Sequence, residues 1–212
     1  MIYPPNINSI KVAILRPVQT PMSDVDLQAL ATRLAHIYPV QERRPGGSGV
    51  ALMNPAVRKS VIVEIPRVLI SEDYVPDPNR AVESIETTLN ETLVTLSMRP
   101  PYPFGVVVDG VANGDQPASV AITSLLGERA NNLIALSDHY DGSGIRSVYQ
   151  KDGRKYDLRL EILVADPSKY FLFADINSFP KPANDRQEIV AEVRRAVEYF
   201  STDVHQAFDS LF

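Results

Sequence analysis

Cysteine is absent from the 212-residue chain. This absence excludes disulfide bonds, thiolate nucleophiles and zinc or iron–sulfur sites with cysteine ligands. Long hydrophobic runs are missing as well, since no stretch approaches the roughly 18 apolar residues that a membrane-spanning helix needs. The opening segment, residues 1–6, lacks the basic and apolar regions of a signal peptide. We therefore expect a cytoplasmic protein that does not enter a membrane.

The chain also lacks an excess of positive charge, because 26 acidic residues against 21 basic ones give a formal net charge of −5. No overall field therefore attracts a phosphate backbone, and the basic residues are scattered among acids. Hydrophobic residues at 44% and charged residues at 22% are close to the average of globular domains, which argues against disorder. We expect one folded domain over residues 1–212, with no nucleic-acid partner.

Capping residues followed by apolar stripes predict three amphipathic helices. The first begins after Ser23 and the second after Asp77-Pro78, where a side-chain oxygen can accept hydrogen bonds from free backbone amides. The third spans about residues 185–211, follows Asn184 as its cap, and repeats apolar residues every three or four positions. Its core-facing stripe consists of Val193, Val197, Phe200, Val204 and Phe208.

Apolar runs and period-2 alternation predict the strands. Ile10, Val12 and Ile14 alternate with other residues over positions 8–16, and the pattern recurs more strongly over 156–164. Other short apolar runs indicate further strands at residues 50–53, 60–70, 104–111, 119–126, 132–136 and 170–176. The order of the elements favours an α+β fold: an antiparallel or mixed sheet with about three helices packed mainly on one face.

A polar cluster lies between residues 137 and 144, where Asp138 and Asp141 flank His139, one of only three histidines. A histidine beside an orienting carboxylate is typical of a general base. On a strand, however, Asp138 and His139 point in opposite directions, and the Asp-Gly-Ser-Gly sequence that follows is typical of a hairpin turn. We predict a strand end and turn with no bound metal. A catalytic site at Asp138, His139 and Asp141 is the alternative.

A second polar segment, residues 43–49, combines two arginines with three glycines and a proline. Glycine amides beside guanidinium groups suit an anion, which makes Arg43, Arg44, Gly47 and Ser48 candidates for an anion-binding loop. The spacing matches neither the phosphate loop of nucleotide triphosphatases nor the glycine pattern of dinucleotide-binding folds. We predict a mobile surface loop and no cofactor.

Three stretches of the chain resemble a sporadically distributed prokaryotic protein family of unknown function. They are the opening strand with its Val18-Gln19 turn, the segment from Tyr38 to Pro45, and the tail from Asp175 through Phe208. Members of that family have no assigned activity, so the resemblance implies no catalytic residue. It implies an accessory role in a mobile or defence-associated locus.

We expect a non-enzymatic binding or assembly protein that presents its sheet and helices to a protein partner or to a second copy of itself. The His-Glu-x-x-His and Gly-x-Ser-x-Gly motifs are absent, which removes two large classes of hydrolase. The alternative is a small hydrolase or nucleotide-handling enzyme that uses Asp138, His139 and Asp141.

Overall fold

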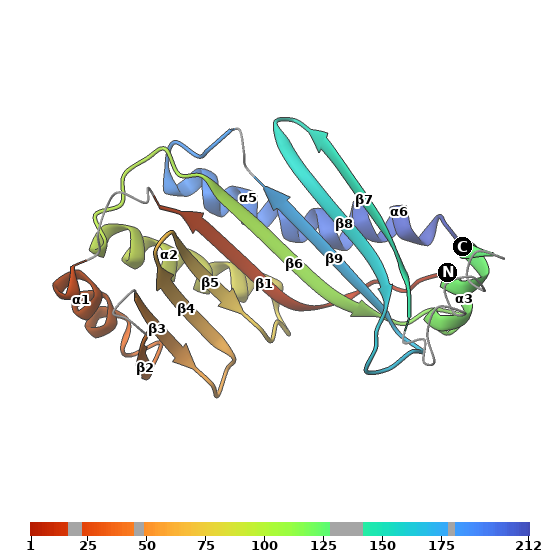
Figure 1. Cartoon of the computed structure of the whole chain (residues 1–212), viewed down its shortest axis with the longest axis horizontal. Helices are drawn as coiled ribbons and strands as arrows, with labels where there is room; N and C mark the ends of the chain where they lie inside the picture. The colour runs from red at the N-terminus through yellow and green to blue at the C-terminus, as the bar shows by residue number, and fades with distance from the viewer. Residues whose placement is uncertain (17–22, 45–48, 128–141, 178–180) are drawn as a thin grey trace.

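A computed structural model describes residues 1–16, 23–44, 49–127, 142–177 and 181–212. Its centre is one antiparallel sheet of nine strands in the order β2-β3-β4-β5-β1-β6-β9-β8-β7 (Figure 1). The strands are β1 (Asn6–Leu15), β2 (Val40–Arg43), β3 (Gly49–Asn54), β4 (Lys59–Glu64), β5 (Arg67–Glu72), β6 (Phe104–Ala112), β7 (Gly144–Lys151), β8 (Arg154–Ile162) and β9 (Tyr170–Asn177).

Side-chain capping begins two of the helices as the sequence predicts. In α1 (Asp24–Leu34), the Ser23 hydroxyl accepts a hydrogen bond from the Asp26 amide at 3.0 Å. In α2 (Pro78–Thr95), the Asp77 carboxylate accepts hydrogen bonds from the Asn79 and Arg80 amides. Each cap satisfies amides that have no partner within their own helix, which fixes where the helix starts.

The closing helix runs without a break through α5 (Arg186–Tyr199), the π-helical segment η2 (Phe200–Val204) and α6 (His205–Asp209). Its cap is Asp185, whose carboxylate accepts from the Glu188 amide at 2.9 Å, so the prediction of Asn184 was wrong by one residue. Asn184 instead donates its backbone N–H to the Glu188 carboxylate. The pattern resembles a capping box, except that the Glu188 carboxylate accepts from the residue before the cap rather than from the cap itself.

Two predicted strands were wrong. Residues 119–126 belong to a helix, α3 (Ala118–Leu126), which buries Ala118, Ala121 and Ile122 at helical spacing and lies at the end of the sheet near both termini (Figure 1). The periodicity of a short apolar run does not separate helix from strand. Residues 60–70 form two strands, because the chain turns at Ile65 and Pro66 and β4 then pairs with β5.

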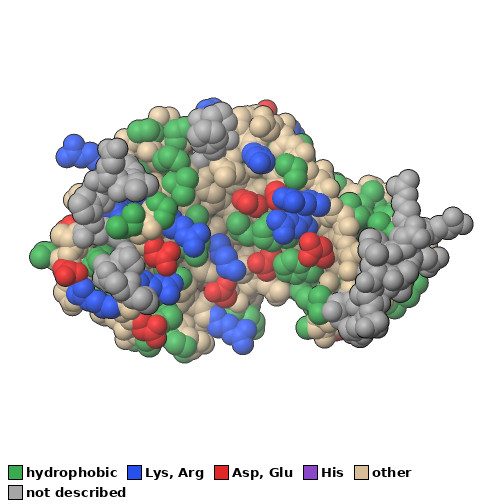
Figure 2. Space-filling model, in the orientation of Figure 1, with side chains coloured by type: hydrophobic (Ala, Val, Ile, Leu, Met, Phe, Trp, Pro, Cys, Tyr) green, Lys and Arg blue, Asp and Glu red, His purple; other side chains and the backbone are tan. Residues whose placement is uncertain are grey.

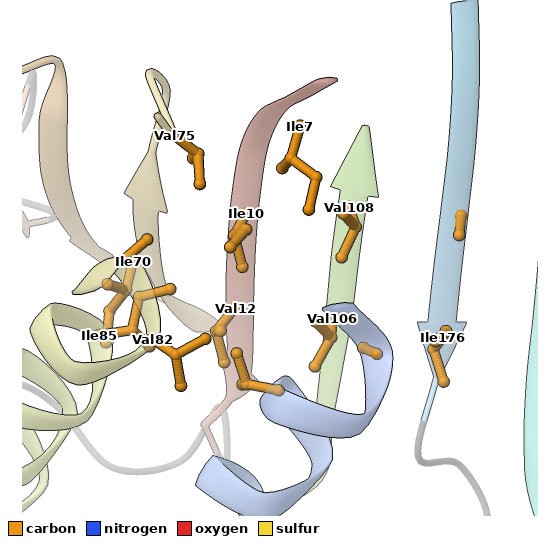
Figure 3. Close-up of a cluster of buried hydrophobic side chains, with 14 of the residues drawn as sticks. Ile7, Ile10, Val12, Ile70, Val75, Val82, Ile85, Val106, Val108 and Ile176 are labelled. Atoms are coloured by element: carbon orange, nitrogen blue, oxygen red, sulfur yellow. The ribbon is translucent and has the colours of Figure 1, made fainter. Parts of the chain in front are cut away.

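The helices α1, α2 and α5 lie together on one face of the sheet and enclose the core (Figure 1). Figure 3 shows Val82 and Ile85 of α2 beside Ile10, Val12 and Ile70 of the sheet. The α+β class with helices on one face is therefore confirmed. The sheet is larger than expected, and the described part of the chain contains four helices rather than three. None of the helices in that part is both long enough and apolar enough to span a membrane.

Candidate functional site

The face of the sheet opposite α1, α2 and α5, called here the open face, carries two rows of directly opposed residues. The first row consists of Ser9, Asp109, Phe173, Arg159 and Arg146. The second row consists of Lys11, Val107, Asp175, Asp157 and Val148. Each row crosses β1, β6, β9, β8 and β7, because alternate residues of neighbouring strands share a face. Figure 2 shows charged side chains of both signs over the middle of this face, with hydrophobic ones among them.

An arginine pair holds one carboxylate of the second row. Arg146 donates two hydrogen bonds to Asp157, Nε to Oδ1 at 2.9 Å and Nη2 to Oδ2 at 2.7 Å. Arg159 adds a third, from Nη2 to Oδ2 at 3.2 Å. These contacts, with that from Arg146 the strongest, lower the pKa of Asp157 to about 2. The three side chains are therefore a preformed, charged unit at neutral pH.

The pKa values of two other carboxylates, Asp109 and Asp175, shift in the opposite direction from that of Asp157, because burial is the largest effect on them. Burial raises the pKa of Asp109, although the Ser9 hydroxyl donates a hydrogen bond to it and works in the other direction. Burial, and after it the charge of Asp157, raises the pKa of Asp175. The neighbouring cation Lys11 forms its ion pair with Asp73, at 3.4 Å. Asp109 and Asp175 are thus partly desolvated carboxylates on the neighbouring strands β6 and β9, one in each row.

Apolar side chains separate these charges. Phe173 lies between Asp109 and Arg159 in the first row, and the Arg159 guanidinium lies 4.8 Å from the centre of the Phe173 ring. Phe173 and Val107 are only partly exposed, whereas Val148 is 50% exposed. An arginine over an aromatic ring gains from the ring quadrupole and from shared burial. The open face therefore combines aromatic, aliphatic and ionised groups within a few residues.

The predicted polar cluster lies outside the described residues, as Asp138, His139 and Asp141 all do. The same is true of Gly47 and Ser48 in the predicted anion-binding loop. These two sites consequently stay predictions.

The two arginines of the predicted anion-binding loop are described. Arg43 is the last residue of β2, and its Nη1 lies 2.6 Å from the Asp24 carboxylate. Arg44 lies 3.3 Å from Glu64. Both guanidinium groups therefore contact a carboxylate of this chain, which competes with any anion for their charge.

Two histidines are described, and neither contributes to the open face. His36 is exposed after the end of α1. His205 belongs to α6, where its Nε2 lies 2.7 Å from the carbonyl oxygen of Ile2. Within the described ranges, no group of three or more acidic or histidine side chains could hold a metal ion. The described residues of the open face offer charges, hydrogen-bonding groups and apolar side chains.

Sequence reasoning found part of the open face and missed the rest. The alternation of Asp157 and Arg159 with buried residues indicated a strand with one wet side. Asp109 and Asp175 sit inside apolar runs that gave no hint of a shared location. They lie on neighbouring strands only because β6 pairs with β9, and these two segments are about 65 residues apart in the chain.

No protein-family model matches the chain. No curated protein matches it either. The resemblance to the sporadically distributed prokaryotic family therefore stays a hypothesis based on three short stretches of sequence.

Proposed function

We propose that this chain is a non-enzymatic binding or assembly protein and that its open face receives a protein partner. The observation that carries the proposal is the position of Phe173, partly exposed in the middle of the face between the Asp109 carboxylate and the Arg159 guanidinium. Aromatic residues and arginine are enriched in protein–protein interfaces and supply much of their binding energy. Val107 and Phe171 extend the apolar surface on either side.

The charges of the open face favour a protein over a nucleic acid. Lys11 is paired with Asp73, directly after β5, and Arg146 and Arg159 are both paired with Asp157. Binding to a phosphate backbone relies on cations that can neutralise phosphates, and such cations usually cluster on one face. A surface that offers both signs in fixed positions instead selects a partner with a complementary pattern of charges.

Burial of Asp109 and Asp175 makes the open face more selective for its partner. Both carboxylates already have raised pKa values, since they are partly removed from water. A lysine or arginine of the partner that reached them would replace the missing solvation with a charge-assisted hydrogen bond. A partner without a cation there would desolvate the Asp109 and Asp175 carboxylates further without adding an opposite charge, which is costly. The partner surface should therefore join an apolar patch to at least one basic side chain.

Photo-cross-linking in cells of the native source tests this proposal. A benzoylphenylalanine at Val107 lies on the open face, and the matched control at Glu83 is exposed on α2, on the helix side. We expect a discrete protein adduct from position 107 and none of that mass from position 83.

A second variant makes the cross-linking result specific. Phe173→Ser in the same chain should abolish the adduct from position 107, because it removes the aromatic contact without touching the covered face. An adduct that forms equally from positions 83 and 107, or that survives Phe173→Ser, would contradict a binding site on the open face. Adducts with the mass of two chains would identify the partner as a second copy.

We also propose a cytoplasmic location and an accessory role in a mobile or defence-associated locus. The lack of a long apolar run supports the location, and the three stretches of family resemblance support the accessory role. The alternative is an enzyme with Asp138, His139 and Asp141 as its catalytic residues, all of which lie outside the described residues.

A further inference from the structure

A cavity of about 300 Å³ lies where the end of β1 meets the connection from α2 to β6. Leu15, Leu96, Met98 and Tyr102 provide its apolar walls, and Arg16 and Arg99 provide its charge. We call it the Arg16 cavity. None of the residues in the two rows of the open face lines it. The volume is at the lower end of the range typical of small-molecule sites.

The charge of this cavity is opposite to that of the whole chain. Two guanidinium groups and no carboxylate are among its described lining residues, although the formal net charge of the chain is −5. A neighbouring cavity of about 500 Å³ shares Met98, Arg99 and Tyr102 with it and adds Arg186. The nearest acid in that neighbouring cavity is Asp185, whose carboxylate already caps α5. Positive charge is therefore concentrated in this part of the surface.

Arg16 is unusual among the charged residues because only 8% of it is exposed. Its burial lowers the pKa of the guanidinium, although arginine stays protonated at any physiological pH. A charge-assisted hydrogen bond to a buried guanidinium is stronger than one at the surface, because water competes less for it. Arg99 is exposed at the mouth of the cavity, where it can attract and orient an incoming anion.

We infer that the Arg16 cavity binds a small organic anion, a carboxylate attached to an apolar body, with the carboxylate directed to Arg16 and Arg99. The apolar walls favour a ligand with an apolar body over an anion that is polar throughout. The site goes beyond the proposed binding of a protein at the open face, and neither depends on the other.

Titration of the isotopically labelled protein with octanoate tests this inference, with 1-octanol as the neutral probe of equal chain length. We expect saturable shifts of the amide signals of residues 96–99 and of Tyr102, with a dissociation constant on the order of 1 mM or tighter. Octanol should bind at least about tenfold more weakly, because it cannot form the charge-assisted hydrogen bonds.

Three variants locate the binding. Arg99→Gln should weaken octanoate binding about tenfold, and Leu15→Glu should abolish it, because a carboxylate of the chain would then occupy the guanidinium groups. Both positions are exposed enough for the fold to tolerate the change. Arg194→Gln, which removes an exposed arginine that pairs with Glu86 on α2, is the control and should leave the affinity unchanged.

Three results would overturn the inference. The first is the absence of saturation by octanoate, and by the bulkier phenylpropionate, up to about 10 mM. The second is equal affinity for octanol and octanoate. The third is an affinity for octanoate that Arg99→Gln and Leu15→Glu leave unchanged.

Discussion

The two faces of the sheet are built from alternate residues of the same strands, yet they differ in kind. On the covered face Ile10, Val12 and Ile14 of β1 are fully buried under the helices. On the open face the same strand presents Ser9, Lys11 and Ala13. A strand whose two faces differ in this way is held in register by its covered face, since a slip of one residue would bury the charges. The open face is then free to vary in composition.

The largest effect should come from Phe200 on the covered face. This side chain is fully buried in η2, and it packs so close to β6 that a Cβ atom on Gly110 would lie 3.1 Å from its ring. We expect Phe200→Ala to lower the free energy of unfolding by about 3–5 kcal/mol through lost burial and a new cavity. Chemical denaturation measures this change, and an unchanged midpoint would refute the packing.

Two adjacent residues of β9 compare the faces directly. Leu172 is fully buried on the covered face, and Phe173 is partly exposed on the open face. Leu172→Ala should cost about 2–5 kcal/mol of unfolding free energy. Phe173→Ala should cost about 1 kcal/mol, mainly the contact with Arg159. Equal losses in denaturation experiments would mean that the open face is covered in solution by something other than water.

Two carboxylates of the open face should respond to pH with opposite signs. The pKa of Asp157 is lowered to about 2, so its ionised form stabilises the fold above its ordinary pKa of 3.8, and this contribution is lost as the pH falls through 2. The pKa of Asp109 is raised, so its neutral form stabilises the fold. This stabilisation is complete below pH 3.8 and is lost as the pH rises through the raised pKa.

The matched variants Asp157→Asn and Asp109→Asn separate these two effects. At pH 7 we expect Asp157→Asn to lower the melting temperature and Asp109→Asn to leave it unchanged or raise it. Near pH 2 the difference between each variant and the parent should shrink, because both carboxyls of the parent approach neutrality. Melting curves recorded between pH 2 and 7 measure this, and a destabilised Asp109→Asn protein at pH 7 would show that its Ser9 contact outweighs burial.

The smallest expected effect is zero and concerns Asp138, His139 and Asp141. If these residues form a strand end and turn, the melting temperature should not respond to zinc, manganese or EDTA. A metal raises the melting temperature only when it binds the folded protein in preference to the unfolded chain. A rise of several degrees with one metal, lost in His139→Ala and kept in His36→Ala, would favour the enzyme alternative.

Local features of the fold were predictable from the sequence. Ser23 and Asp77 cap their helices because the capping oxygen and the amides that it serves are only two or three residues apart. The buried stripe of the closing helix, with Phe200 and Val204, follows from spacing alone. The π-helical turn within it had no signal in that spacing.

Features that depend on distant contacts were not predictable. The sequence predicts a strand where α3 forms, because the short apolar run does not distinguish helix from strand and Pro117, at the start of the helix, offers no side-chain cap. The acceptors for the amides of Ala118 and Ser119 are carbonyl oxygens about 50 residues away, at Ser168 and Pro167. The open face was missed for the same reason. Asp109 and Asp175 come onto neighbouring strands only through the order of strands, which a single sequence does not reveal.

The affinity of the cross-linked partner for the purified chain, measured by titration calorimetry, tests the central claim most directly. The account predicts that Phe173→Ser weakens binding at least about tenfold, as a central aromatic contact does, while Val94→Ser, an exposed change on α2, does not alter it. If the partner is a second copy, sedimentation velocity gives the same comparison. An affinity that Phe173→Ser leaves unchanged and Val94→Ser lowers would move the binding surface to the helices and contradict the account.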